Sequence, residues 1–92
     1  MTIARFPLGQ VVGTPGALLA LAEAGETPDA FLTRHIGGDS GELDEHDRSE
    51  NERAVVTGCR LLSAYTLRTG ERLWVITEAD RSSTTMLLPS EY

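Results

Sequence analysis

Three short runs rich in β-branched and aromatic residues lie in the C-terminal third of the chain, at 60–67, 72–78 and 83–88. Thr69 and Gly70 separate the first two runs, and residues 80–82 separate the last two. Runs of this composition, bounded by Gly and Asp, are typical of antiparallel strands joined by tight hairpins. The pattern therefore predicts a three-stranded antiparallel β-meander over residues 59–89.

The register of this meander depends on the length of its first loop. A two-residue loop at Thr69 and Gly70 would place Tyr65 opposite Trp74, on one face with Ile76 and Leu87. The other face would then carry Leu62, Ala64, Leu73, Val75 and Met86. Because both faces carry apolar residues, we expect helices to cover one and the N-terminal arm or a partner to cover the other.

Two Thr-Pro pairs predict the starts of two short helices. Thr is a good N-cap, and Pro suits the first helical position because its missing N–H is not needed there. The first helix follows Thr14 and ends at Gly25, and the second follows Thr27 and ends at Gly37. Together they form a helical hairpin. His35 falls on the apolar stripe of the second helix, where a hydrogen-bonded core or rim residue is more common than a catalytic base.

A third helix is predicted from Asp44, as N-cap, to about Thr57, with Gly58 as its stop. Its first two turns are almost wholly charged, so apolar burial is confined to the region of Ala54 and Val55. We expect this helix to be half docked, with its acidic front in water.

Residues 1–13 carry scattered apolar positions interrupted by Pro7 and Gly9, which predicts an arm or a short edge strand. The expected fold is thus α+β in a single domain, residues 1–92. A helical part, 14–57, packs on the meander at 59–89. No apolar run approaches the roughly 20 residues that span a bilayer, and the N-terminus lacks the apolar core of a secretory signal. We expect a cytoplasmic protein without membrane contact, and the single Cys59 agrees with a reducing compartment.

Charge is concentrated in one stretch. Residues 39–52 hold seven acids and one base, Arg48, so their net charge of −6 equals that of the whole chain. The acids are Asp39, Glu42, Asp44, Glu45, Asp47, Glu50 and Glu52. An acidic patch argues against direct binding of nucleic acid, which requires clustered Lys and Arg. A charge run on a helix is usually only a solvated face. It is also compatible with a basic protein partner, and we treat these seven residues as the candidate partner-binding surface.

Neither a metal site nor a cofactor site is indicated. His46 stands among acids, but no second His or Cys follows at ligand spacing. Residues 39–50 do not fit a calcium loop, because Gly41 and Leu43 occupy ligand positions. No Gly-rich phosphate loop and no Gly-x-Ser-x-Gly elbow is present. We therefore expect no catalytic residues, no metal and no cofactor.

The densest polar group surrounds the second hairpin, and it supports an enzymatic alternative. Glu78, Asp80 and Arg81 could act on a phosphodiester, as in small ribonuclease-like toxins. The simpler interpretation, which we favour, is a turn in which Asp80 caps backbone N–H groups and Arg81 pairs with a carboxylate. A third alternative is a dimeric regulatory subunit. These three residues, with Tyr65 and Trp74, form a second candidate patch, and Tyr65 and Trp74 would mark the homodimer face.

Several segments resemble one family: 14–18, 38–41, 51–52, 62–65 and, above all, 74–82 through 88–92. They resemble small acidic bacterial proteins carried on plasmids, phages and integrated elements, which are labelled "plasmid-related" and sometimes attached to restriction systems. The family pattern has Trp where this chain has Ser40, so a stacking role at that position does not carry over to this chain. The family has no established catalytic residues to transfer.

The resemblance implies a setting on mobile elements, where small acidic proteins often blunt host defence. Together with the acidic helix, it favours a non-enzymatic inhibitor of a nucleic-acid-binding defence complex, of the anti-CRISPR or anti-restriction kind. The expected partner is a basic protein complex of the host.

Overall fold

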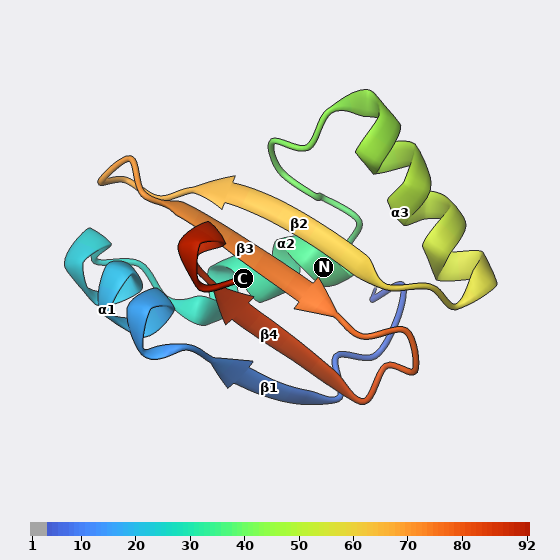
Figure 1. Cartoon of the computed structure of the whole chain (residues 1–92), viewed down its shortest axis with the longest axis horizontal. Coiled ribbons are helices and arrows are strands. Elements are labelled where there is room, and N and C mark those ends of the chain that lie inside the picture. The colour runs from blue at the N-terminus through green and yellow to red at the C-terminus, as the bar shows by residue number, and fades with distance from the viewer. Residues whose placement is uncertain (1–3) are drawn as a thin grey trace.

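A four-stranded mixed sheet organises residues 4–92, the part of the chain that the computed structural model describes (Figure 1). Ile3, at the start of the apolar pattern of the predicted arm, lies outside these residues. The strands are β1 (Gln10–Gly13), β2 (Leu61–Thr66), β3 (Arg72–Thr77) and β4 (Ser83–Leu87). Their order in the sheet is β1-β4-β3-β2.

The α+β class agrees with the prediction, but the three-stranded antiparallel meander is wrong. β1 adds a fourth strand, and it runs parallel to β4, with Gln10 opposite Ser83. The other two strand pairs are antiparallel. No turn signal encodes the pairing of β1 with β4, because the two strands are joined by most of the chain rather than by a hairpin.

Local signals do fix the helices. In α1 (Pro15–Ala24), the Thr14 side chain accepts from the Ala17 N–H at 3.2 Å, and Gly25 ends the helix at φ +67°. α2 (Pro28–Ile36) also begins at a proline. α3 is Glu45–Thr57, and a single 3₁₀ turn, η1 (Pro89–Glu91), closes the chain. None of the helices in residues 4–92 is long and apolar enough to cross a bilayer.

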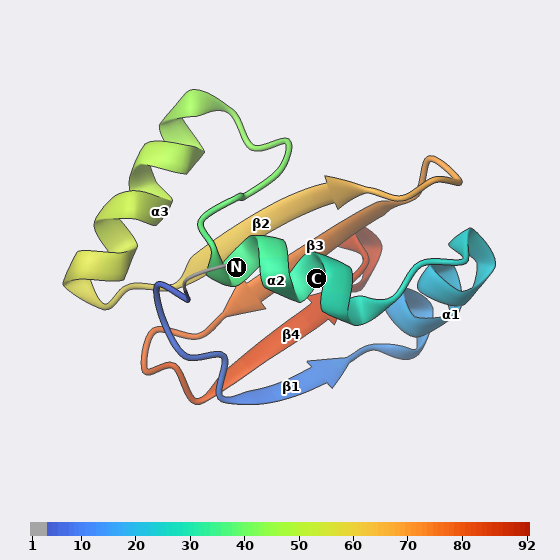
Figure 2. The same ribbon diagram turned by 180° about the vertical axis from the view of Figure 1, so that it is seen from behind.

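Helices α1 and α2 cover one face of the sheet (Figure 2). The main core lies between these two helices and the sheet. It includes Leu21, Phe31, Tyr65, Leu73 and Met86, all almost fully buried. A second, smaller cluster joins Phe6, Ala54 and Leu61 beneath α3. The opposite face of the sheet is covered in part by η1 and by Tyr92, which follows it and packs edge-on against Trp74.

The predicted register is wrong by one residue. The first hairpin loop has three residues, 68–70, because the Leu67 N–H donates to the Glu71 carbonyl at 2.8 Å and Gly70 takes φ +92°. This is the three-residue loop with a left-handed glycine, not the two-residue turn. Trp74 therefore lies opposite Ala64, and Tyr65 lies opposite Leu73. A one-residue shift moves every side chain of a strand to the other face, so Tyr65 and Trp74 lie on opposite faces.

The two edges of the sheet differ. At the β2 edge, Gly41 forms an isolated parallel bridge with Ala64. The Ala64 N–H donates to the Ser40 carbonyl at 3.0 Å, and its carbonyl accepts from the Glu42 N–H at 2.8 Å. The protein thus covers the β2 edge with its own chain. β1 forms the other edge, and within residues 4–92 it pairs only with β4.

Candidate functional site

Helix α3 carries most of the candidate partner-binding residues, and local capping contacts define both of its ends. The Asp44 carboxylate accepts from the Asp47 N–H at 2.9 Å, and Gly58 at φ +76° ends the helix. Glu45 and Asp47 lie in the first turn, where the helix dipole favours negative charge. Only Ala54 of its thirteen residues is buried. Most of the helix is therefore exposed to solvent, as the sequence predicted.

Few contacts hold α3 to the rest of the protein. The Asn51 side chain donates to the Leu62 carbonyl and accepts from the Leu62 N–H at 3.1 Å. It thus pairs with the β2 edge as a neighbouring strand would. Ala54 packs against Phe6 and Leu61. The Arg81 guanidinium donates to the Ala54 carbonyl at 3.0 Å, near the C-terminal end of the helix.

The seven predicted partner-binding acids fall into two groups. Asp39 and Glu42 precede α3 and are engaged within the fold. Asp39 accepts from Arg34 Nε at 2.7 Å, and this hydrogen bond is the main reason that the pKa of the Asp39 carboxyl lies below its usual range. Glu42 accepts from the Thr66 hydroxyl at 2.7 Å and lies 3.9 Å from Arg72. Neither side chain is free for a partner without losing these contacts.

The other five acids belong to α3 and its N-cap, and all five are exposed. They are Asp44, Glu45, Asp47, Glu50 and Glu52. Among the described residues, the ion pairs include just one of them, Glu50 with Arg53 at 3.5 Å. That pair is highly exposed and contributes little to stability. Few of these carboxylates are therefore ion-paired, and with Arg48 and Arg53 counted, residues 44–57 keep a net charge of −3 (five acids, two arginines).

The second candidate patch does not form one surface. Tyr65 is buried in the main core, where its hydroxyl donates to the Asp39 carbonyl at 2.6 Å, and burial raises its pKa to about 12. Trp74 lies on the opposite face of the sheet, with Leu62, Ile76, Arg60 and Tyr92 around a concavity of about 330 Å³.

The second hairpin is held together by its own polar groups. Arg81 takes φ +60°, and its guanidinium donates to the carbonyls of Cys59, Glu78 and Ala79 as well as Ala54. Asp80 accepts from the Ser82 N–H at 2.9 Å. The Glu78 carboxylate lies 3.9 Å from Arg60. All three residues therefore have structural contacts, and Arg81 bonds to carbonyl oxygens rather than to the carboxylate that we expected.

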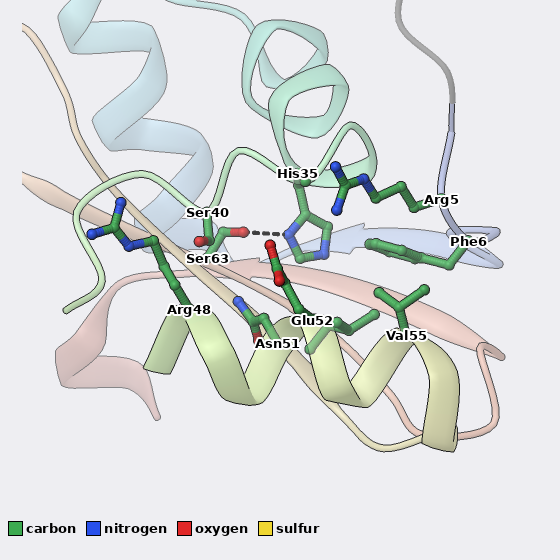
Figure 3. A pocket seen from close by; sticks show the side chains of 11 residues that line it. Arg5, Phe6, His35, Ser40, Arg48, Asn51, Glu52, Val55 and Ser63 are labelled. Carbon is green, nitrogen blue, oxygen red and sulfur yellow. Dashed lines mark hydrogen bonds between the residues drawn. The ribbon is translucent and has the colours of Figure 1, made fainter. Parts of the chain in front are cut away.

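A chain of hydrogen-bonded, buried polar side chains lies beside α3, and the sequence did not predict that these residues are connected. It links His35, Ser63, Thr77 and Thr84, all nearly inaccessible to solvent. The prediction that His35 is a hydrogen-bonded core residue is confirmed. Figure 3 shows His35 and Ser63 at a pocket that is also lined by Arg5, Arg48 and Glu52. The cavity measures about 60 Å³, room for a few water molecules.

The hydrogen-bond partners fix the proton positions along this chain. The Leu8 carbonyl can only accept, so the Thr84 hydroxyl donates to it at 2.8 Å. Thr77 must then donate to Thr84 at 2.7 Å, and it accepts from His35 Nε2 at 2.9 Å. His35 Nδ1 is left to accept from the Ser63 hydroxyl at 2.6 Å. Each hydroxyl uses its one proton, so this chain specifies the Nε2–H tautomer of His35.

This arrangement suits a polar core better than catalysis. Burial lowers the pKa of His35 to about 4, so the ring is a weak base at neutral pH. Ser63, its hydrogen-bond partner, is itself buried. His35, Thr77 and Thr84 come from three different elements, which is why the sequence could not join them. The one available signal was the position of Thr77 and Thr84 at inward-facing places in apolar strands.

Among residues 4–92, no three His, Cys, Asp or Glu side chains lie close enough to hold a metal ion. Comparison of the chain with family models, with curated proteins and with solved structures gives no match. The site must therefore be interpreted from its own geometry and charge.

Proposed function

We propose that the protein is a non-enzymatic accessory protein of a mobile element that inhibits a nucleic-acid-binding defence complex of the host. It does so by presenting α3 to the basic surface on which that complex holds DNA or RNA. The observation that supports this is the excess of negative charge on α3 and its N-cap: five exposed carboxylates against two arginines, with one ion pair, between Glu50 and Arg53 of the same helix. The family resemblance described above supports the setting.

The linear charge density of α3 can be compared with that of a nucleic acid. An α-helix rises about 1.5 Å per residue, so the five acids from Asp44 to Glu52 extend over about 12 Å. Arg48 lies in the same stretch, so the net charge is about −4, or roughly one negative charge per 3 Å, against about one phosphate per 1.7 Å of duplex axis. A surface built to bind phosphates therefore meets charge of the same sign on α3, at about half the linear density. Binding of this kind is fast and weakens as salt screens the charges.

Asp39 and Glu42 take a different role in this proposal. Their bonds to Arg34, Thr66 and Arg72 hold the segment that leads into α3, so they position the helix instead of contacting the partner. The contacts of Glu78, Asp80 and Arg81 likewise favour a structural turn over the ribonuclease alternative.

The first experiment is affinity capture with a charge-matched control. The protein is immobilised, a lysate containing defence complexes is applied at low salt, and bound material is released with rising salt or with duplex DNA. The triple variant Glu45→Gln, Glu50→Gln, Glu52→Gln removes three charges from α3. The control Glu23→Gln, Asp29→Asn, Glu71→Gln removes three exposed charges elsewhere.

We expect a nucleic-acid-binding complex to be captured by the wild type and by the control, to be released by DNA, and to be lost with the α3 variant. With three fewer contacts, the salt concentration needed for release should fall sharply. Equal capture by the two triple variants would show that α3 is not the binding surface. A captured complex that DNA does not release would contradict the proposed competition.

A further inference from the structure

The outer edge of β1 is the least protected part of the sheet. All four residues of β1, Gln10–Gly13, are exposed. The strand contains no charged residue and no proline, which are the usual devices that prevent an edge from pairing. The opposite edge, β2, is covered by residues 40–42 and by Asn51. The contrast identifies β1 as the one strand of the described chain that is available for pairing.

The hydrogen-bonding groups of β1 can be assigned to its two sides. The Gln10 N–H donates to the Ser82 carbonyl at 2.9 Å, and the Thr14 N–H donates to the Met86 carbonyl at 3.0 Å. The backbone N–H and C=O groups of successive residues point to opposite sides of a strand. Those of Val12 therefore also point toward β4. The N–H and C=O groups of Val11 and Gly13 therefore point outward.

These outward groups have one best antiparallel partner, which is a second copy of the same strand. A twofold axis at Val12 places Val11 of each copy opposite Gly13 of the other, so that both pairs exchange two hydrogen bonds. Axes at Val11 or Gly13 give one such pair, because the next partners would be Gly9, which has left the strand at φ +65°, or Pro15, which lacks an N–H.

The side chains fit the same arrangement. Val11, Val12 and Leu18 are among the few large apolar residues of residues 4–92 that are strongly exposed, at 43%, 41% and 50%. Space above Gly13 is taken by Leu18, whose Cδ2 lies 2.9 Å from where a Cβ would be. In the pairing at Val12, Val11 of one copy lies over Gly13 of the other and meets its Leu18. Val12 meets Val12 across the axis.

The distribution of charge also permits two copies to approach. The net charge of the chain resides in residues 39–52, and α3 flanks β2, at the opposite edge from β1 (Figure 1). Two copies joined at β1 therefore keep their acidic helices at the far ends of the assembly. Repulsion between them is screened over such separations at physiological salt.

We infer that β1 is a homodimer interface, in which two copies pair antiparallel about Val12 and join their four-stranded sheets into one continuous sheet. The interface is small, with four backbone hydrogen bonds and two kinds of apolar side-chain contact, so the dimer is in reversible equilibrium with the monomer. It leaves α3 of both copies free. This interface differs from the Tyr65 and Trp74 face, and it does not depend on the function proposed for α3.

A charge-swap experiment tests both the interface and its register. In a twofold pairing at Val12, Val12→Lys places two like charges opposite each other, and so does Val12→Glu. We expect the wild type to dimerise at high concentration and each variant alone to be monomeric. An equimolar mixture of the two variants should recover a dimer. Val56→Lys and Val56→Glu, at an 86% exposed position of α3, are the matched controls and should dimerise as the wild type does.

The readout is mass by light scattering up to about 1 mM chain. A reducing agent is included because Cys59 is exposed. Circular dichroism and thermal unfolding establish that each variant is folded. A wild type that is monomeric throughout overturns the inference. A dimer that survives in each Val12 variant places the interface elsewhere and also overturns it. Failure of the mixture to dimerise rejects the register at Val12.

Discussion

His35 is the residue on which the polar contacts of the core converge. Both ring nitrogens are engaged, one by Ser63 and one by Thr77. Phe6 packs edge-on against the ring, with centroids 5.1 Å apart. Arg5, Arg48 and Glu52 line the pocket beside it, yet burial, and not a neighbouring charge, lowers its pKa. The neutral ring is therefore part of the folded state.

This burial predicts a loss of stability in mild acid. The ordinary pKa of 6.5 applies to the unfolded chain, and the folded value is about 4. Between these values the unfolded state binds a proton that the folded state does not, so stability falls as pH falls through this window. From pH 7 to pH 5 we expect a loss of about 2 kcal/mol from His35 alone. Urea unfolding of the wild type and of His35→Gln at both pH values measures it. An equal loss in both proteins would contradict the prediction.

Helix α3 depends on one side chain more than on its apolar contacts. Asn51 bonds both backbone groups of Leu62, while the helix buries a single alanine. The amide suits this position because it donates and accepts at once. The helix that carries the candidate binding surface is thus attached by an edge-strand contact, which leaves its acidic side free.

Asn51→Asp should release α3 from the sheet. The carboxylate cannot donate to the Leu62 carbonyl and faces it with like charge, so we expect a loss of about 1 to 3 kcal/mol. Amide exchange should accelerate along α3 before it does so in β3 and β4. Ser49→Asp adds the same charge at an exposed position of the same helix and serves as control. Similar exchange in the two variants would show that charge, and not the lost bond, is responsible.

At the scale of the whole molecule, the C-terminal turn is tied to the start of α1. The Glu91 carboxylate accepts from the Thr14 hydroxyl at 2.5 Å, from the Leu88 N–H at 2.9 Å and from the Gly16 N–H at 3.2 Å. A Cβ at position 16 would lie 2.6 Å from this carboxylate, so any larger residue there would displace the end of the Glu91 side chain. The same end of the chain brings Tyr92 over Trp74.

Glu91→Gln should loosen this connection without unfolding the protein. The bond to Thr14 is the main reason that the pKa of Glu91 is lowered, so its contribution is present above the ordinary pKa of 4.5 and is lost as pH falls through the lowered value. We expect faster exchange of the Gly16 and Leu88 amides at neutral pH, and convergence of the two proteins in acid. Glu23→Gln, an exposed change within α1, should leave both amides unaffected.

Sequence patterns predicted where the helices and strands lie in the chain better than they predicted which elements pair in space. The caps at Thr14, Asp44, Gly25 and Gly58 lie where predicted, because a cap is decided by the few residues around it. The three C-terminal strands were also found. The fourth strand, β1, was not placed in the sheet, because its partner β4 lies at the other end of the chain.

The candidate site was likewise predictable only in part. Local composition identified the acidic helix, but only the fold separates Asp39 and Glu42, which bind Arg34 and Arg72, from the exposed acids of α3. The error in register had a larger effect. One additional loop residue, with Gly70 left-handed, moved Tyr65 into the core and left Trp74 on the other face.

The sequence by itself determined where the helices begin and end, which segments form strands, and where the net charge lies, because each depends on neighbours along the chain. Only the tertiary structure decided how the strands pair, which edge of the sheet stays open, and that His35 is linked to Thr77 and Thr84. Those features depend on hydrogen bonds between residues far apart in sequence, whose partners no local pattern specifies.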